Sequence, residues 1–238
     1  MRAILAGIGA LALISASAVA ASAASLQVAP TTIDMTAPDS ASVLTLRNGG
    51  KKPISVQVRV FRWSQANGVE KLEPTKNVVA SPPGAKLAPN QDYVVRVLRT
   101  GKTPVAGEES YRVLVDEVPV KQDARDAAVS FVIRHSIPVF FKQQDVGKPQ
   151  VTWSIENGAK GVVLKARNDG DSRMRIADLK AVQGGKAIAS RPGLVGYVLG
   201  GSTMVFPLGA KKVGSGAVAI NATTDLGALE AKAAVNGR

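Results

Sequence analysis

Short runs of β-branched and aromatic residues, separated by turn residues at regular spacing, are the feature that most constrains this 238-residue chain. Almost no stretch after the first two dozen residues has the periodicity of an amphipathic helix. The pattern predicts an all-β fold built from sandwiches. The predicted strands are Leu26–Ile33, Ser42–Arg47, Ile54–Trp63, Val78–Ala80, Tyr93–Leu98, Tyr111–Val118, Val129–Phe141, Val151–Ile155, Gly161–Ala166, Arg173–Ala181, Tyr197–Leu199, Thr203–Pro207 and Ala217–Thr223.

The N-terminal segment predicts export. Met1-Arg2 is followed by an apolar run and by the small-x-small site Ala21-Ser22-Ala23. These are the parts of a cleavable signal peptide, which we assign to residues 1–24. A membrane anchor is the alternative, but serines interrupt the apolar run. No later stretch is apolar enough to cross a bilayer, so we expect an exported mature chain without membrane insertion.

The remaining chain predicts two domains. About 210 residues are enough for two sandwiches of roughly 100 residues each. The polar stretch Lys142–Gln150 is the predicted linker, which gives domains of residues 25–144 and 145–238. Trp63 and Trp153 are expected to anchor one core each. The Ala-rich tail Leu226–Val235 locally prefers a helix, but the architecture favours a last strand, which we predict.

Composition limits the partners. The chain has 30 Lys and Arg against 18 Asp and Glu, a net charge of +12, and no Cys. A basic surface suits nucleic acid, an anionic membrane or an acidic protein. Export argues against nucleic acid, so an acidic protein partner and a merely solvated basic surface remain. Without Cys, the exported fold is stabilised by burial rather than by disulfides.

The motifs of catalysis are absent. His135 is the single histidine, so a catalytic triad or a histidine metal site would depend on it alone, and an ordinary strand residue is the simpler interpretation. Gly101-Lys102-Thr103 resembles the end of a phosphate-binding loop, but Arg96 stands where the first glycine belongs. We therefore expect no enzyme, no catalytic residue, no metal and no cofactor.

The stretch Val129–Phe141 carries the strongest functional signal. Val129, Phe131 and Ile133 alternate with smaller or polar residues, so they share one face of a strand. Pro138 cannot donate to a ladder, which places the strand at an edge or a bend. An open edge with apolar side chains must be covered or used, and we predict that it pairs with a partner strand. The alternative is that the three side chains face the chain's own core.

Four segments carry a family resemblance: Ile54–Trp63, Ala80–Val97, Tyr111–Pro119 and Val129–Phe141. In order and spacing they resemble the periplasmic pilus-assembly chaperones of the PapD-like family, and Arg134-x-Ser136-Ile137-Pro138 resembles its archaic branch, which serves spore-coat-type and biofilm pili. The resemblance implies two immunoglobulin-like sandwiches in an L. It also implies pilin subunits and an outer-membrane usher as partners. The chaperone lends its edge strand to an unfinished pilin, a mode of strand addition known for this family.

The resemblance further implies a basic anchor for the terminal carboxylate of the pilin. The family's two basic positions fall at Thr32 and Pro138, and neither is basic here. The replacement candidates are Arg112, Arg134 and Arg96, because arginine can bind a carboxylate through two parallel hydrogen bonds. A solvated charge or an internal ion pair is the alternative for each.

The family also joins its domains through a buried charge cluster. Glu117, Lys142 and Asp225 match those positions, and their opposite signs allow a closed network.

Two other classes of function remain as alternatives. A secreted adhesive sandwich, itself a fibre subunit, would carry its own donor extension, but little chain precedes Leu26 after cleavage of the signal peptide. A carbohydrate-binding or hydrolytic sandwich would need aromatic platforms or paired carboxylates, and aromatic residues are only 4% of the chain.

Overall fold

A computed structural model describes residues 26–118, 132–158, 161–210 and 212–236. All regular elements in these ranges are β-strands. No helix in the described part is long and apolar enough to span a membrane. The predicted signal peptide, Val129 and Phe131 lie outside the described residues.

The first sandwich contains two sheets that enclose one apolar core. One sheet has the order β1-β3-β8-β6 and the other β2-β10-β9-β4-β5, with β7 paired to β4. The core includes Leu44, Val95, Val113 and Phe141, one or more from each sheet. The strands are β1 (Leu26–Ala29), β2 (Ile33–Thr36), β3 (Ala41–Asn48), β4 (Ile54–Ala66), β5 (Val69–Pro74), β6 (Val78–Ser81), β7 (Gly84–Leu87), β8 (Asp92–Arg99), β9 (Glu108–Val118) and β10 (Arg134–Lys142).

The last strand of the second sandwich connects its two sheets. The strand order is β14-β13-β16-β17-β11-β12-β15. Strand β17 pairs antiparallel with β16 through its first seven residues and parallel with β11 through its last three. The chain thereby passes from one sheet to the other around a separate core that includes Trp153. The strands are β11 (Val151–Gly158), β12 (Gly161–Asn168), β13 (Met174–Gln183), β14 (Lys186–Val198), β15 (Thr203–Pro207), β16 (Val218–Thr224) and β17 (Gly227–Asn236).

The tail is a strand, as predicted, because pairing with two neighbours outweighs the local helix preference of alanine. The predicted strand Leu26–Ile33 is instead two strands, which pair with different sheets on either side of Pro30. Strand β5 was not predicted, because all six of its residues are exposed and no alternation marks it.

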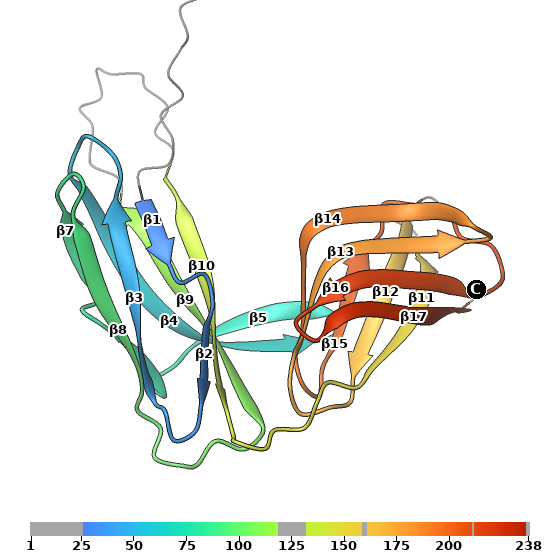
Figure 1. The fold of residues 1–238 in the computed structure, drawn as a ribbon, viewed down its shortest axis with the longest axis horizontal. Helices are drawn as coiled ribbons and strands as arrows, with labels where there is room; N and C mark the ends of the chain where they lie inside the picture. The colour runs from blue at the N-terminus through green and yellow to red at the C-terminus, as the bar shows by residue number, and fades with distance from the viewer. Residues whose placement is uncertain (1–25, 119–131, 159–160, 211, 237–238) are drawn as a thin grey trace, which may run out of the picture.

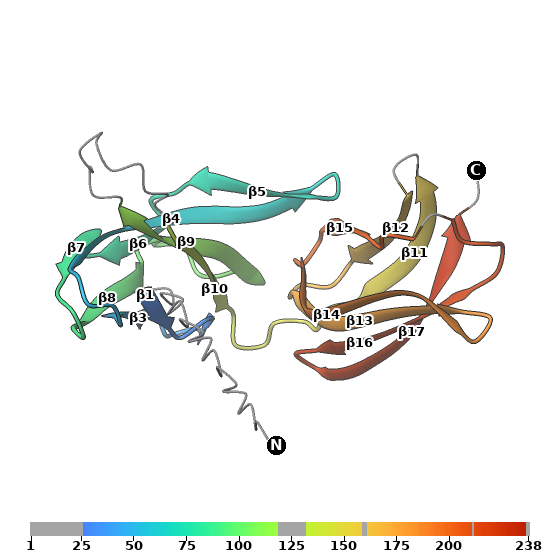
Figure 2. The same ribbon diagram turned by 90° about the horizontal axis from the view of Figure 1, so that it is seen from above.

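The two sandwiches lie side by side and are joined by residues 143–150 (Figure 1). Figure 2 shows the β4–β5 hairpin extending from the first sandwich toward the second. Its turn is the predicted Asn67-Gly68, whose φ angles of 53° and 80° are those that a tight hairpin turn requires.

The hairpin corrects the expectation for Trp63. In the part of β4 that crosses the core, Ile54, Val56 and Val58 are the buried positions. Trp63 is offset by an odd number of residues and faces the other way. It is buried with Phe140, Tyr197 and Leu199 in a cluster between the domains, whereas Trp153 belongs to the second core as predicted. Trp63 therefore joins the two sandwiches.

Candidate functional site

Strand β10 has an open edge. It pairs antiparallel with β9 over its whole length, from Arg134 to Lys142. Its other neighbour, β2, pairs with it only from Val139 onward. Within the described residues, Arg134–Pro138 thus has a strand partner on one side alone.

The ladder fixes which main-chain groups point outward. The Glu117 N–H donates to the Ile133 carbonyl at 3.0 Å, so positions 133, 135 and 137 bond to β9. The N–H groups of Arg134 and Ser136 therefore point to the open side. At the β2 end, the Lys142 carbonyl points to the same side and accepts from the Ala37 N–H at 2.9 Å. Pro138 occupies an outward position, where its missing N–H costs no bond to β9.

The side chains of β10 divide between two environments. Ile137, Val139 and Phe141 belong to the core of the first sandwich. Ile133 shares their face by period two, yet it is only half-buried and does not pack against that core cluster. Its neighbour Val132 is 53% exposed. Ile133 therefore lies past the end of the core, beyond His135 on the same face, which favours a partner over the alternative of the chain's own interior.

His135 lies within strand β10. It lies on the core-side face of β10, and its Nε2 atom is 3.1 Å from the Leu26 carbonyl oxygen of β1. No cluster of three or more His, Asp or Glu side chains among the described residues is arranged to hold a metal.

Arg112 lies at the junction of the two sandwiches. It stands on β9 directly opposite Pro138, and its side chain is 13% exposed. The guanidinium carbon is 3.7 Å from the centre of the Trp63 ring and 5.6 Å from the centre of the Tyr197 ring. Its carboxylate neighbour, Glu70 of β5, is 3.7 Å away, beyond hydrogen-bond distance. Burial lowers the pKa of Arg112, and Glu70 opposes that effect.

The structure does not bring the other two predicted anchor residues to Arg112. Arg96 is exposed on β8, which belongs to the opposite sheet. Arg134 is on the same sheet face but four positions along the strand, about 13 Å at the rise of a strand. There it pairs with Asp116, which also accepts from Arg59 at 2.6 Å. Burial raises the pKa of Asp116, but hydrogen bonds from Arg134 and Arg59 outweigh it and hold the pKa below its usual value.

The two positions at which the resemblance implies basic residues, Thr32 and Pro138, lie near Arg112. The parallel register of β2 and β10 pairs Ile33 with Val139. One residue earlier, this register places Thr32 beside Pro138, and Pro138 is the cross-strand neighbour of Arg112. An arginine one strand further into the sheet therefore stands beside the two uncharged positions.

An ion cluster joins the domains, but none of its members is one of the three predicted residues. Arg173, just before β13, pairs with Glu108 at the start of β9 and with Asp34 of β2, the latter at 2.7 Å. The Glu108 side chain is 2% exposed and also accepts from the Arg173 main-chain N–H at 3.0 Å. Burial raises the pKa of Glu108, and Arg173 partly offsets this.

The prediction of Glu117 in this cluster is wrong. Glu117 lies opposite Val56 near the far end of β9, nine residues from Glu108, or about 30 Å along the strand. Lys142 lies opposite Glu108. Lys142 and Asp225 do line the same cavity of about 190 Å³ beside Glu108 and Arg173, without an ion pair between them. Two of the three predicted residues therefore lie near the interface, but the ion cluster itself is formed by Arg173, Glu108 and Asp34.

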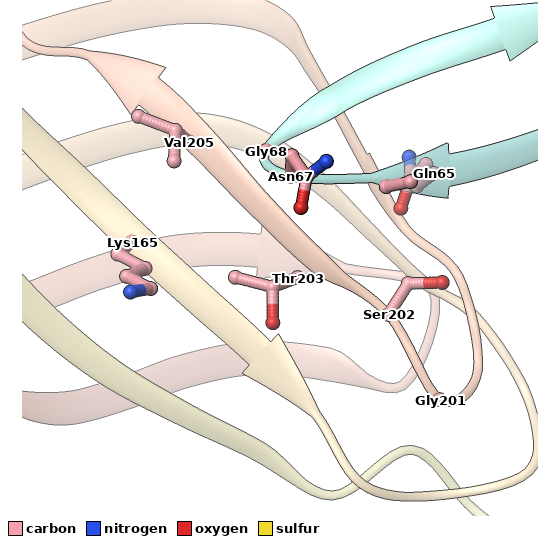
Figure 3. A pocket seen from close by; sticks show the side chains of 9 residues that line it. Gln65, Asn67, Gly68, Lys165, Gly201, Ser202, Thr203 and Val205 are labelled. Carbon is pink, nitrogen blue, oxygen red and sulfur yellow. The ribbon is translucent and has the colours of Figure 1, made fainter.

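The β4–β5 hairpin binds the second domain through Gln65. This buried side chain donates to the Tyr197 carbonyl at 2.9 Å and accepts from the Leu199 N–H at 2.8 Å. Gly68 packs against Val205, where a Cβ atom would lie 2.6 Å from a methyl group. Beside the hairpin tip, residues of β12, β15 and the turn before β15 line a cavity of about 510 Å³ (Figure 3).

Several of these residues were not predicted from the sequence: Gln65, Glu70, Glu108, Arg173 and Tyr197. Alternate side chains of a strand point to opposite faces of the sheet, and this separates two groups of residues on β4 and β9. Tyr111 faces the core of the first sandwich, whereas Trp63 and Gln65 face the second domain. That alternation was readable in the sequence for Trp63. The contacts of Arg173 and Tyr197 depend on how the two domains meet, for which the sequence carries no local signal.

The fold and the open edge define a class: a two-domain immunoglobulin-like protein in which β10 has an open edge and a largely buried arginine lies on the neighbouring strand. The family model described as "Pili and flagellar-assembly chaperone, PapD N-terminal domain" matches residues 25–146, just over half of the chain. The chain belongs to this family, and its role is that of a chaperone in pilus assembly. The fold class and the family predicted from the sequence are confirmed.

Solved structures agree. A chain from the complex of the chaperone CsuC with the tip subunit CsuE, from the archaic Csu pili of Acinetobacter baumannii, is 26% identical, with a TM-score of 0.71 over 90% of this chain and 100% of that one. The E. coli chaperone DraB is 22% identical, with a TM-score of 0.60 over 88% and 96%. A chain from the Salmonella enterica complex of the SafA pilin with the SafB chaperone is 22% identical, with a TM-score of 0.59 over 88% of this chain and 94% of that one. The last two show the fold alone. No curated protein sequence matches.

Proposed function

We propose that this chaperone holds an unfinished pilus subunit in the periplasm by adding the edge of β10 to the subunit's sheet, and then delivers the subunit to an outer-membrane usher. The observation that carries the proposal is the open edge at Arg134–Pro138, with its outward N–H groups at Arg134 and Ser136. A relative 26% identical is described in complex with a subunit of archaic pili, which supports a subunit as the partner.

Strand addition satisfies both molecules. Main-chain hydrogen bonds to the subunit would pair the outward groups of β10, which otherwise remain an exposed edge. The apolar residues Val129, Phe131 and Ile133 would fill the groove that the missing subunit strand leaves open. A fully buried side chain of this kind contributes about 1.5–3 kcal/mol. The half-burial of Ile133 beyond the core supports its part in this.

Arg112 would bind the subunit's terminal carboxylate. Its guanidinium is held between the domains and is only slightly exposed, and its main chain lies opposite Pro138, where the open edge ends. A client strand whose C-terminus lies at Pro138 has its preceding residues alongside Arg134–Ile137. It therefore runs in the same direction as β10. Release would follow replacement of β10 by a better-fitting subunit strand. The proposal includes no nucleotide, no cofactor and no catalytic step.

Co-expression with a pilus subunit of the same organism tests the proposal. Phe131→Asp and Ile133→Asp are expected to abolish co-purification of the subunit and to lower its yield. Val94→Asp is the matched control, because Val94 is an exposed apolar residue on the opposite sheet. Unchanged capture by both donor-strand variants would mean that β10 is not the donor. Spontaneous polymers of the isolated chain on size-exclusion chromatography would instead favour a fibre subunit.

A further inference from the structure

The carboxylate beside Arg112 has an unusual combination of properties. Among the described residues, Glu70 is the acidic side chain within ion-pair range of Arg112, and its nearest oxygen is 3.7 Å from Nη2. Glu70 is 42% exposed, whereas Arg112 is 13% exposed. The guanidinium donates no hydrogen bond to another described side chain or carbonyl. A largely buried cation is therefore paired, loosely, with a carboxylate that is itself accessible to water.

The position of Glu70 is nevertheless fixed. In the β4–β5 ladder it lies directly opposite Gln65. Gln65 is clamped to the second domain by its two hydrogen bonds to the main chain at Tyr197 and Leu199. The ring of Tyr197 lies next to Trp63 and Arg112. The hairpin thus fixes the main chain of Glu70 beside the Arg112 site, within reach of its carboxylate.

We propose that Glu70 is a placeholder carboxylate, which pairs with Arg112 in the free chaperone and yields that place to the terminal carboxylate of the client. This inference rests on the proposed function. Removing the partner of a buried charge is costly, whereas exchanging one carboxylate for another keeps the cation paired in both states. The stacked guanidinium keeps its N–H groups at the ring edge, and these can form two parallel bonds to an incoming carboxylate.

The exchange has a consequence for affinity. Because the client must displace Glu70, its terminal carboxylate gains only the difference between a close two-bond contact and the loose 3.7 Å contact. Glu70 therefore weakens client binding and favours release, a useful property in a chaperone that must give its client away. It also discriminates, since a strand end without a free carboxylate cannot replace Glu70.

Glu70→Gln tests the inference, with Glu73→Gln as the matched control. Glu73 lies on the same strand, is also exposed, and pairs with Lys71 at 2.8 Å rather than with Arg112. Differently tagged wild-type and variant full-length chaperones are co-expressed with one limiting pilus subunit, and the ratio of captured subunit is measured. Glu70→Gln is expected to capture about two- to fivefold more than wild type, the range of a modest ion pair, and Glu73→Gln the same as wild type.

Two further variants separate the explanations. The gain from Glu70→Gln is expected to vanish in the Arg112→Ala background, and with a subunit whose C-terminus carries an added two-residue extension. Equal or reduced capture by Glu70→Gln at an unchanged melting temperature overturns the placeholder role, as does a gain that persists without Arg112. If Glu70→Gln lowers the melting temperature of the chaperone, the test is repeated with Glu70→Ala. The placeholder role then requires that Glu70→Ala captures more subunit than wild type and that this gain is lost with the extended subunit. Loss of capture by Phe131→Asp is unaffected by these results, so failure of the placeholder role and failure of strand addition are distinguishable.

Discussion

Two arginines of the first sandwich are almost equally buried and differ in what surrounds them. Arg99 is 9% exposed and is fully engaged: Nε and Nη2 donate to the two oxygens of Glu109 at 2.9 and 2.8 Å. Its other N–H groups donate to the carbonyls of Gly101 and Thr103. Arg112 instead has an aromatic ring against its face and a single carboxylate at 3.7 Å. The N–H groups of Arg99 are thus used within the chain, whereas Arg112 keeps N–H donors that a ligand can use.

The same contrast separates the two regions in which these residues lie. The Arg99–Glu109 pair connects β8 of one sheet to β9 of the other, and the Tyr111 hydroxyl donates to the same carboxylate at 2.9 Å. It completes the interior of one domain. The Arg112 site is built from β4, β5 and β9 of the first sandwich together with Tyr197 of β14, so it lies at the junction of the two domains. We infer that burial of a charge marks function here only where its hydrogen bonds are left unmade.

The largest expected effect on stability is that of breaking the buried Arg99–Glu109 ion pair. Glu109→Ala leaves Arg99 buried without a carboxylate partner, and such a loss typically costs about 3–5 kcal/mol of the free energy of unfolding. Urea denaturation at neutral pH measures it. Asp92→Ala is the control, because it breaks the exposed pair with Arg47, where about 0–1 kcal/mol is expected. Equal effects of the two substitutions would contradict the contrast.

Arg112→Ala is expected to act on the client instead of the fold. Hydrogen bonds to a charged group contribute about 1.5–3 kcal/mol, so capture of the subunit should fall by roughly ten- to a hundredfold. The melting temperature should stay near that of wild type, since loss of the stacking on Trp63 is a smaller effect than loss of the Arg99 pair. A pull-down with the tagged subunit, together with thermal unfolding, measures both. A large stability loss without a specific loss of capture would make Arg112 structural.

The acid dependence of stability should single out Glu109. The hydrogen bond from Arg99 lowers the pKa of Glu109 below its ordinary value of 4.5. A carboxyl group with a lowered pKa in the folded state adds stability above its unfolded pKa and loses it as the pH falls through the folded pKa. The stability difference between wild type and Glu109→Gln should therefore be largest near neutral pH and shrink below about pH 4.5. A difference that grows on acidification would contradict the sign.

Arg134→Ala should give the smallest of these effects. Its side chain is 60% exposed, and Asp116 retains Arg59 as a partner when Arg134 is removed. Exposed ion pairs contribute about 0.2–1 kcal/mol, so capture of the subunit should weaken by no more than about fivefold, with an unchanged melting temperature. Isothermal titration or quantitative pull-down beside Arg112→Ala ranks the two. A loss as large as that of Arg112→Ala would place the carboxylate near Arg134.

Period-two patterns in the sequence predicted most of the strands, because burial of alternate residues is a local property, and the resemblance of four segments predicted the family. Register is not local. Glu108 and Glu117 are both acidic residues of β9, and only the pairing with Lys142 reveals which one lies at the interface. Arg96 and Arg112 are likewise equivalent in sequence, while sheet assignment puts them on opposite sheets of the sandwich. Strand β5 carries no burial pattern at all, so Glu70 could not have been singled out.

The central claim is that the open edge of β10 pairs with a strand of the client. Amide hydrogen exchange measured at single residues tests this claim most directly. In the free chaperone, the amides of Arg134 and Ser136 face the open side, whereas those of His135 and Ile137 already bond to β9. On binding a pilus subunit, exchange at Arg134 and Ser136 should slow strongly, with Val94 on the other sheet unchanged. A saturated complex in which Arg134 and Ser136 exchange as fast as in the free protein would contradict the account.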